Sequence, residues 1–166
     1  MAETPPTLEA WKAETTAIDR VQSVATTVSE PQPASYIAEE ALVAENTARD
    51  HLQRLVDWNI LVERDRDGTT VYAPDPLHAR VQTIRDLLAE YDRNGLIDLK
   101  ADVQERIESL RAEYGADGPD ALRGQAATTD TAAETRDRLK AASDWGLLRW
   151  RLDAIEAAIE NYDTYT

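Results

Sequence analysis

The sequence predicts a mostly α-helical protein with one small β-hairpin. Apolar residues recur at helical spacing through most of the 166 residues. One Asp67-Gly68 pair separates two short runs that are rich in β-branched and aromatic residues, which is a strong hairpin signal. After Pro76 the apolar spacing of three and four continues to the end of the chain. This pattern indicates a second, wholly helical region.

The composition points to a salt-rich cytoplasm. The chain carries 18 basic and 32 acidic residues, a formal charge of −14, and only three of the basic residues are lysine. The acids are spread along the chain rather than gathered in a tail. In concentrated salt the Debye length falls to about 3 Å at 1 M, so charge repulsion is heavily screened. We therefore expect a cytoplasmic, halophilic protein whose negative charge does not exclude DNA as a partner.

Several classes of function find no support in the sequence. There is no cysteine, and His51 and His78 are the only histidines, so no metal-ligand cluster and no cofactor site are predicted. No run of apolar residues is long enough for a membrane span, and no signal peptide is expected. Glycine-rich phosphate loops, nucleophile elbows and His-Glu-x-x-His motifs are absent. The sequence therefore predicts that the protein is not an enzyme.

The first expected elements are a tail and a helix. Residues 1–13 are polar and contain Pro5-Pro6, which predicts a flexible tail. Residues 14–28 follow with one apolar helix face, formed by Ile18, Val21, Ala25 and Val28. Pro31 and Pro33 should end that helix, because proline lacks the backbone donor and restricts the residue before it.

A helix pair and a hairpin make up the rest of the first region. The spacing predicts a short helix over residues 34–42 and a second helix from Glu45, with a turn between them, which is a helix-turn-helix arrangement. Strands are expected at residues 60–64 and 69–73, with Pro74 and Pro76 closing the second strand. We therefore predict a winged helix-turn-helix domain over residues 14–76. In such a domain the second helix enters the DNA major groove and the hairpin is the wing.

Residues 77–166 are expected to form a C-terminal helical region, either antiparallel or coiled-coil-like. Apolar stripes predict helices separated by Asn94-Gly95 and by Gly115. Residues 115–133 have little periodicity and predict a loop with a short helix. The stripes fit helices that pack on one another, or a seam between two chains. We favour a homodimer, since DNA readers of this class pair to span two half-sites.

Residues 37–74, IAEEALVAENTARDHLQRLVDWNILVERDRDGTTVYAP, resemble the winged helix-turn-helix transcription regulators of archaea and bacteria. They are especially similar to a haloarchaeal set loosely labelled ArsR-like, as are EAWKAETTAIDRV near the start and AIENYDTY near the end. The resemblance implies a role in transcription regulation without implying a target. Two positions depart from the pattern: Leu42 stands near the usual turn glycine, and Ala44 replaces the usual Ser or Thr cap.

Ten residues are candidates for contact with double-stranded DNA. Arginine can bind guanine and glutamine or asparagine can bind adenine through two hydrogen bonds, while hydroxyls and wing arginines suit phosphates. Other interpretations stay open: Arg49 pairs with Glu45 or Gln53, the wing arginines balance Asp65 and Asp67, and Tyr36 packs. The candidates are Ser35, Tyr36, Asn46, Thr47, Arg49, Gln53, Arg64, Arg66, Thr69 and Thr70.

The predicted function is sequence-specific, DNA-binding regulation of transcription by a homodimer. The alternative is a winged helix that serves as a protein-interaction module and does not bind DNA. Residues 14–80 hold six arginines and twelve acids, a net charge of −6, which favours the alternative. The sequence identifies no effector ligand.

Overall fold

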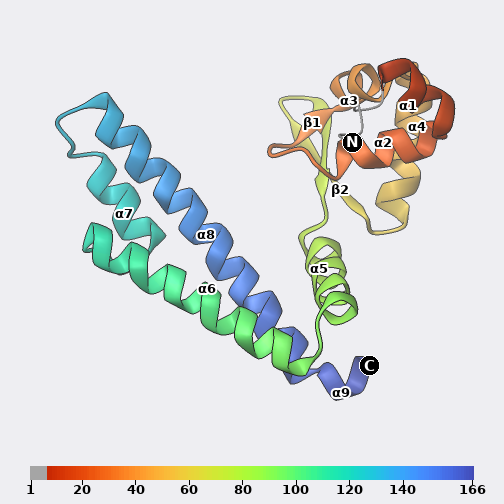
Figure 1. Cartoon of the computed structure of the whole chain (residues 1–166). Coiled ribbons are helices and arrows are strands. Elements are labelled where there is room, and N and C mark those ends of the chain that lie inside the picture. The colour runs from red at the N-terminus through yellow and green to blue at the C-terminus, as the bar shows by residue number, and fades with distance from the viewer. Residues whose placement is uncertain (1–6) are drawn as a thin grey trace. The chain divides into compact units, whose positions relative to one another are not determined.

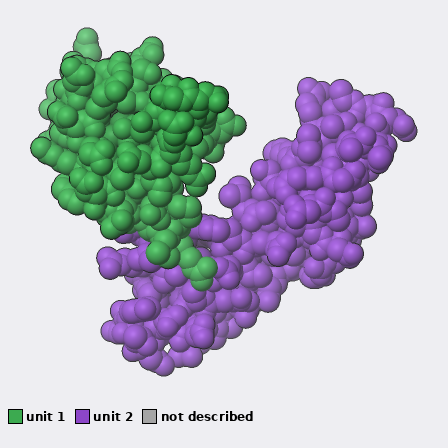
Figure 2. Space-filling model, turned by 180° about the vertical axis from the view of Figure 1, so that it is seen from behind, with its two compact units in different colours: residues 1–80 green, residues 81–166 purple. Residues whose placement is uncertain are grey.

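The computed structural model describes residues 7–166, which form nine helices and a small antiparallel sheet (Figure 1). The prediction of a mostly helical protein with a small β element is confirmed. The chain divides into two compact units, Met1–Arg80 and Val81–Thr166, each with its own buried core (Figure 2). We call them unit 1 and unit 2. The division lies within helix α5, four residues after the expected boundary at residue 76.

Unit 1 contains four helices and all three strands. Its helices α2 and α4 and its hairpin lie close to the predicted positions, although α2 is shorter than expected. The elements are α1 (Leu8–Glu14), α2 (Ala17–Ala25), β1 (Gln32–Pro33), α3 (Ala34–Ala41), α4 (Glu45–Asp57), β2 (Leu61–Arg66) and β3 (Thr69–Pro74). Their core is built from side chains of α2, α3, α4 and the sheet, including Val21, Ile37, Leu52, Leu55 and Leu61.

The start of the chain differs from the predicted tail. Residues 8–14 form helix α1, with Thr7 capping its first turn, whereas residues 1–6 lie outside the described residues. The buried Arg20 holds this segment in place: its Nη1 donates to the Thr15 carbonyl at 2.7 Å and to the Lys12 carbonyl at 3.1 Å. Its Nε donates to the Ala41 carbonyl at 2.9 Å. One side chain thus ties the end of α1 to the end of α3.

The hairpin forms as the Asp67-Gly68 pair predicts. Both residues have positive φ, 53° and 83°, which is the geometry of the two-residue turns that match strand twist. The strands pair from Arg66 opposite Thr69 to Leu61 opposite Pro74. The sheet has a third strand that was not predicted, because β1 pairs with β3 through Gln32 and Pro33.

Helix α4 begins at Glu45 without a side-chain cap. Ala44 occupies the N-cap position and makes no cap hydrogen bond. Leu42, in the preceding turn, has φ 57° and ψ 44°, the left-handed conformation that costs a residue with a Cβ about 1–2 kcal/mol. Leu42 therefore adopts the backbone conformation that favours glycine, and Ala44 leaves the first turn of α4 without a side-chain cap.

We expect Ala44→Ser to raise the free energy of unfolding by about 1 kcal/mol, because a serine hydroxyl can accept a hydrogen bond from a free N–H group of the first turn. Ala44 is exposed, so the added oxygen stays in contact with water. Equilibrium unfolding by denaturant measures the change. Ala101→Ser, at an exposed position inside helix α6, is the control and should be slightly destabilising. An equal gain from both substitutions would contradict the capping explanation.

Unit 2 is helical throughout. It comprises the second part of α5 (Pro76–Glu90), α6 (Arg93–Tyr114), α7 (Pro119–Ala126), α8 (Ala132–Glu160) and α9 (Tyr162–Tyr165). Helices α6 and α8 run side by side in opposite directions, and α7 packs against α8 (Figure 1). The predicted stripes of α6 and α8 are buried largely against each other, with Val103, Ile107, Trp145 and Ile155 in one core. For these two helices, packing within the chain accounts for the apolar stripes.

The break between α5 and α6 lies earlier than predicted. Asn94-Gly95 does not interrupt a helix but lies in the first turn of α6. Asp92 is the N-cap residue, and its side chain accepts a hydrogen bond from the Gly95 backbone N–H at 2.7 Å. An aspartate cap therefore begins the new helix three residues before the expected glycine. At the other end Gly115, with φ 59°, ends α6 as predicted.

Candidate nucleic-acid interface

A polar hollow of about 380 Å³ lies between α3, α4 and the hairpin in unit 1. The start of α3 contributes Ser35, one face of α4 contributes Arg49 and Gln53, and β3 contributes Thr69 and Thr70. Arg49 and Gln53 are one helical turn apart, so both project from the same side of α4. Five of the ten candidate residues are thus brought together around one concave surface.

The other five candidates lie outside this hollow. Tyr36 lines a different depression, beside residues of α2 and the loop that follows it. Asn46 is exposed and Thr47 half-buried on α4. Arg64 is exposed on β2, and the Arg66 guanidinium donates to the Pro31 carbonyl at 2.9 Å. The two hairpin arginines are accessible but do not line the hollow.

The charges at the hollow are mixed. Arg49 forms an ion pair with Glu45 across one turn of α4, and both side chains remain about half exposed or more. The hydrogen bond to Glu45, and its charge, raise the pKa of Arg49, so the guanidinium stays cationic. The pairing with Glu45 that the sequence left open is therefore present, whereas Gln53 donates to Asp57 at 3.1 Å.

Six residues that line the hollow were not among the candidates, and two of these, Asp50 and Tyr72, add ionisable groups beside Glu45. Asp50 adds a second carboxylate beside Glu45, and Tyr72 forms part of the wall. Burial raises the pKa of the Tyr72 phenol, the charge of Glu63 raises it further, and Arg49 opposes the rise. The helical spacing of Asp50 next to Arg49 already placed it near this face. Tyr72 enters the wall only because the hairpin brings β3 back against α2 and α3.

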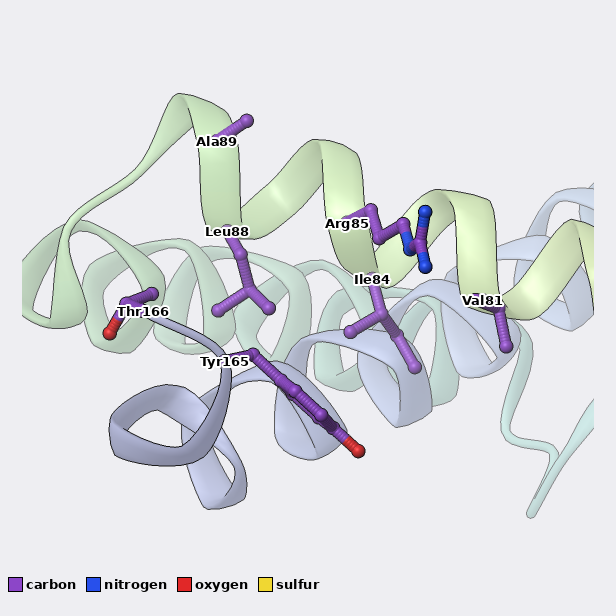
Figure 3. A pocket seen from close by; sticks show the side chains of 7 residues that line it. All are labelled: Val81, Ile84, Arg85, Leu88, Ala89, Tyr165 and Thr166. Atoms are coloured by element: carbon purple, nitrogen blue, oxygen red, sulfur yellow. The ribbon is translucent and has the colours of Figure 1, made fainter.

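A second concave surface lies in unit 2, on α5. It is an apolar groove of about 590 Å³ in which Ile84 and Leu88 of α5 point toward the ring of Tyr165 (Figure 3). Leu77 and Val81, from the same stripe of α5, are 70% and 41% exposed. The stripe predicted on α5 therefore differs from those of α6 and α8, because the described chain leaves much of it uncovered.

The chain was compared with protein families. A model described as a family of unknown function, DUF7342, matches residues 15–164, which cover most of both units. The chain belongs to this family. No curated protein matches the DUF7342 chain. The family model therefore includes both unit 1 and unit 2.

Two further features bear on the DUF7342 chain. Over residues 7–166, no helix is long and apolar enough to cross a membrane. The same residues contain no group of three or more histidine, aspartate or glutamate side chains placed to hold a metal ion.

Proposed function

We propose that unit 1 is a winged helix-turn-helix domain and that the DUF7342 chain is a sequence-specific DNA-binding regulator of transcription. The main support is the grouping of Arg49 and Gln53 of α4 with the hydroxyls of Ser35, Thr69 and Thr70. Helix α4 would enter the major groove, where arginine and glutamine discriminate base pairs. The hydroxyls and the exposed Arg64 and Arg66 would contact the phosphate backbone.

The proposal requires Arg49 to exchange partners. In the free protein Arg49 is paired with Glu45, and such exposed pairs are worth only up to about 1 kcal/mol. A bidentate contact with guanine contributes about 1–3 kcal/mol of discrimination. The exchange is therefore favourable for a matching base and unfavourable for a mismatched one. In concentrated salt this short-range term gains weight, because counterion release contributes less.

We also propose that the regulator acts as a homodimer. The support is the stripe of α5, in which Leu77, Val81, Ile84 and Leu88 follow the spacing of four and three that is typical of helix–helix seams. Because Leu77 and Val81 are exposed in the single chain, a second copy of α5 would cover them. Two copies would present two α4 helices to successive half-sites.

The alternative is a protein-interaction module built on the same fold. Its support is the pair of acids at the hollow, Glu45 and Asp50, which oppose an approaching phosphate. The exposed Trp58, at the end of α4, is a side chain that protein interfaces favour. A module of this kind would bind its partner with the acidic face and would not select DNA.

Replacing Arg49 and Arg64 together by alanine tests the DNA-binding proposal. We expect a loss of affinity for a selected DNA site of about tenfold or more, since one base contact and one phosphate contact are removed. Fluorescence anisotropy with a labelled duplex in concentrated KCl measures it. Arg106→Ala, at an exposed arginine of α6 in unit 2, is the matched control. Unchanged affinity in the double variant would show that α4 and the hairpin do not read DNA.

Glu45→Gln is expected to have the opposite effect. The substitution removes a carboxylate from the hollow and leaves Arg49 without its ion-pair partner, so DNA affinity should rise by a few-fold, in line with an exposed pair of up to about 1 kcal/mol. The same anisotropy titration measures the change, with Glu105→Gln, at an exposed position of α6 in unit 2, as the control. Weaker binding by Glu45→Gln would mean that Glu45 itself contacts the target.

A further inference from the structure

One face of α8 combines exposed apolar side chains with cations. Leu139, Leu147 and Trp150 are 46%, 66% and 43% exposed, although each is large and apolar. With 3.6 residues per turn they share a face with Arg136, Lys140, Ser143 and Arg151, and all of these residues are exposed. We call these seven residues the α8 outer face. Trp145, which lies in the core, is on the opposite side of α8.

The charge of this stretch is opposite to that of the chain. Residues 136–151 hold five basic and two acidic residues, a net charge of +3. The rest of the chain holds thirteen basic and thirty acidic residues, a net charge of −17. A cationic, apolar helix face is therefore a local exception on a strongly acidic protein.

The cations of the α8 outer face have no acidic partner in the described chain. Arg136, Lys140 and Arg151 form no ion pair there, whereas the other cations of unit 2 include several that do. Arg136 and Lys140 are four residues apart, a spacing at which like charges destabilise a helix slightly. The paired cations of unit 2 are Arg93, Lys100, Arg111 and Arg123.

The same face is already buried further along α8. Ala154 and Ala158 follow Trp150 at spacings of four residues, and they are 1% and 0% exposed. They belong to the same buried cluster as Leu87 of α5. Small residues at these positions allow another helix to approach closely. The face is therefore packed against the rest of unit 2 at Ala154 and Ala158. Its large exposed side chains lie on the preceding turns of α8.

We propose that the α8 outer face binds an acidic, amphipathic α-helix of a partner protein. Leucine and tryptophan at helical spacing fit the apolar stripe of such a helix, and Arg136, Lys140 and Arg151 fit acids along its edges. The α8 outer face of a second copy is a poor partner, because its cations would lie against the same cations of the first copy. Duplex DNA fits less well, since Leu139 and Leu147 would face phosphates. The inference does not depend on DNA binding by unit 1.

Two designed peptides test the proposal on the full chain. Both are helices of about 21 residues, or three heptads, with leucine in the seam; one carries glutamate along its edges and the other lysine. Anisotropy of the labelled peptides should show that the wild type binds the acidic peptide about tenfold tighter or more. The variant R136E/K140E/R151E should reverse this preference, and L147Q/W150Q should lose binding of both peptides. Circular dichroism verifies that each variant keeps its helices.

Matched substitutions on α6 are the controls. Ile97→Gln removes an apolar side chain that is as exposed as Leu139, and Arg106→Glu reverses an exposed cation; neither should change binding. Equal affinity for both peptides, no binding, or a preference that does not reverse would overturn the proposal. If sedimentation shows that L147Q/W150Q no longer self-associates, the proposal is also overturned, because the face then binds a second copy of the chain. Selective binding of duplex DNA by this face would overturn it in favour of nucleic acid.

Discussion

Arg20→Met is expected to lower the free energy of unfolding of unit 1 by about 3–5 kcal/mol. The guanidinium is 6% exposed and donates to the carbonyls of Ala41, Thr15 and Lys12. A buried carbonyl that loses its donor costs about 1–3 kcal/mol, and methionine supplies no donor. The substitution also releases α1 from the end of α3, because Arg20 is the side chain that joins them.

Equilibrium unfolding by denaturant, followed through helix content, measures this loss. Arg54→Met, at an exposed position of α4, is the matched control and should change the free energy by less than about 0.5 kcal/mol. Arg20→Lys should not restore stability, because an ammonium lacks the planar fork that reaches separate carbonyls. A loss from Arg20→Met no larger than that of the control would show that the buried hydrogen bonds do not hold unit 1 together.

Trp145→Ala is expected to destabilise unit 2 by about 3–5 kcal/mol, the range for deleting a fully buried aromatic side chain. Trp145 is 1% exposed and lies in the core shared by α6, α7 and α8. Unit 1 has a separate core, so its amides should keep their protection from hydrogen exchange while those of α6 to α8 lose it. Exchange monitored by mass spectrometry resolves the two units.

Trp150→Ala is the control for this prediction, since it removes the same side chain from the exposed face of the same helix. Its cost should stay below about 1 kcal/mol. Where Trp145→Ala leaves unit 2 unfolded, Trp145→Phe keeps part of the buried area and should give an intermediate loss. Equal loss of protection in unit 1 and unit 2 would contradict the account of two separate cores.

The elements that the sequence predicted well are those fixed by local chemistry. Asp67-Gly68 specifies its turn through two positive φ angles, and Gly115 ends α6 in the same way. Helices α2, α3 and α4 of unit 1 follow from their apolar spacing, because a single face of each must reach the core. These features depend on a few neighbouring residues, so no knowledge of the rest of the fold was needed.

The elements that the sequence missed depend on distant partners. Strand β1 is two residues long and exists only because Gln32 and Pro33 meet Tyr72 and Val71 of β3. Helix α1 is tied down by Arg20, whose carbonyl partners lie up to 21 residues away. The expected break at Asn94-Gly95 was wrong because the carboxylate of Asp92 caps the helix first. Periodicity carries no information on such contacts.

The candidate site was predictable in part for the same reason. Arg49 and Gln53 share a helix face by spacing alone, and the hairpin places Thr69 and Thr70 close to them. Arg64 and Arg66 were expected beside this face but lie outside the hollow, and the Arg66 guanidinium donates to the Pro31 carbonyl instead. The choice of Glu45 as the partner of Arg49 depends on side-chain conformation, which spacing leaves open.

The proposed regulator must select particular DNA sequences through unit 1. The most direct test incubates the wild-type protein, in about 2 M KCl to keep charge repulsion screened, with random fragments of its source genome and with the region upstream of its own gene. Bound fragments are then sequenced. We expect a few fragments with a shared two-part motif to be enriched. No enrichment at any salt concentration, by a protein that is folded and dimeric in sedimentation, would contradict it and favour the protein-interaction module.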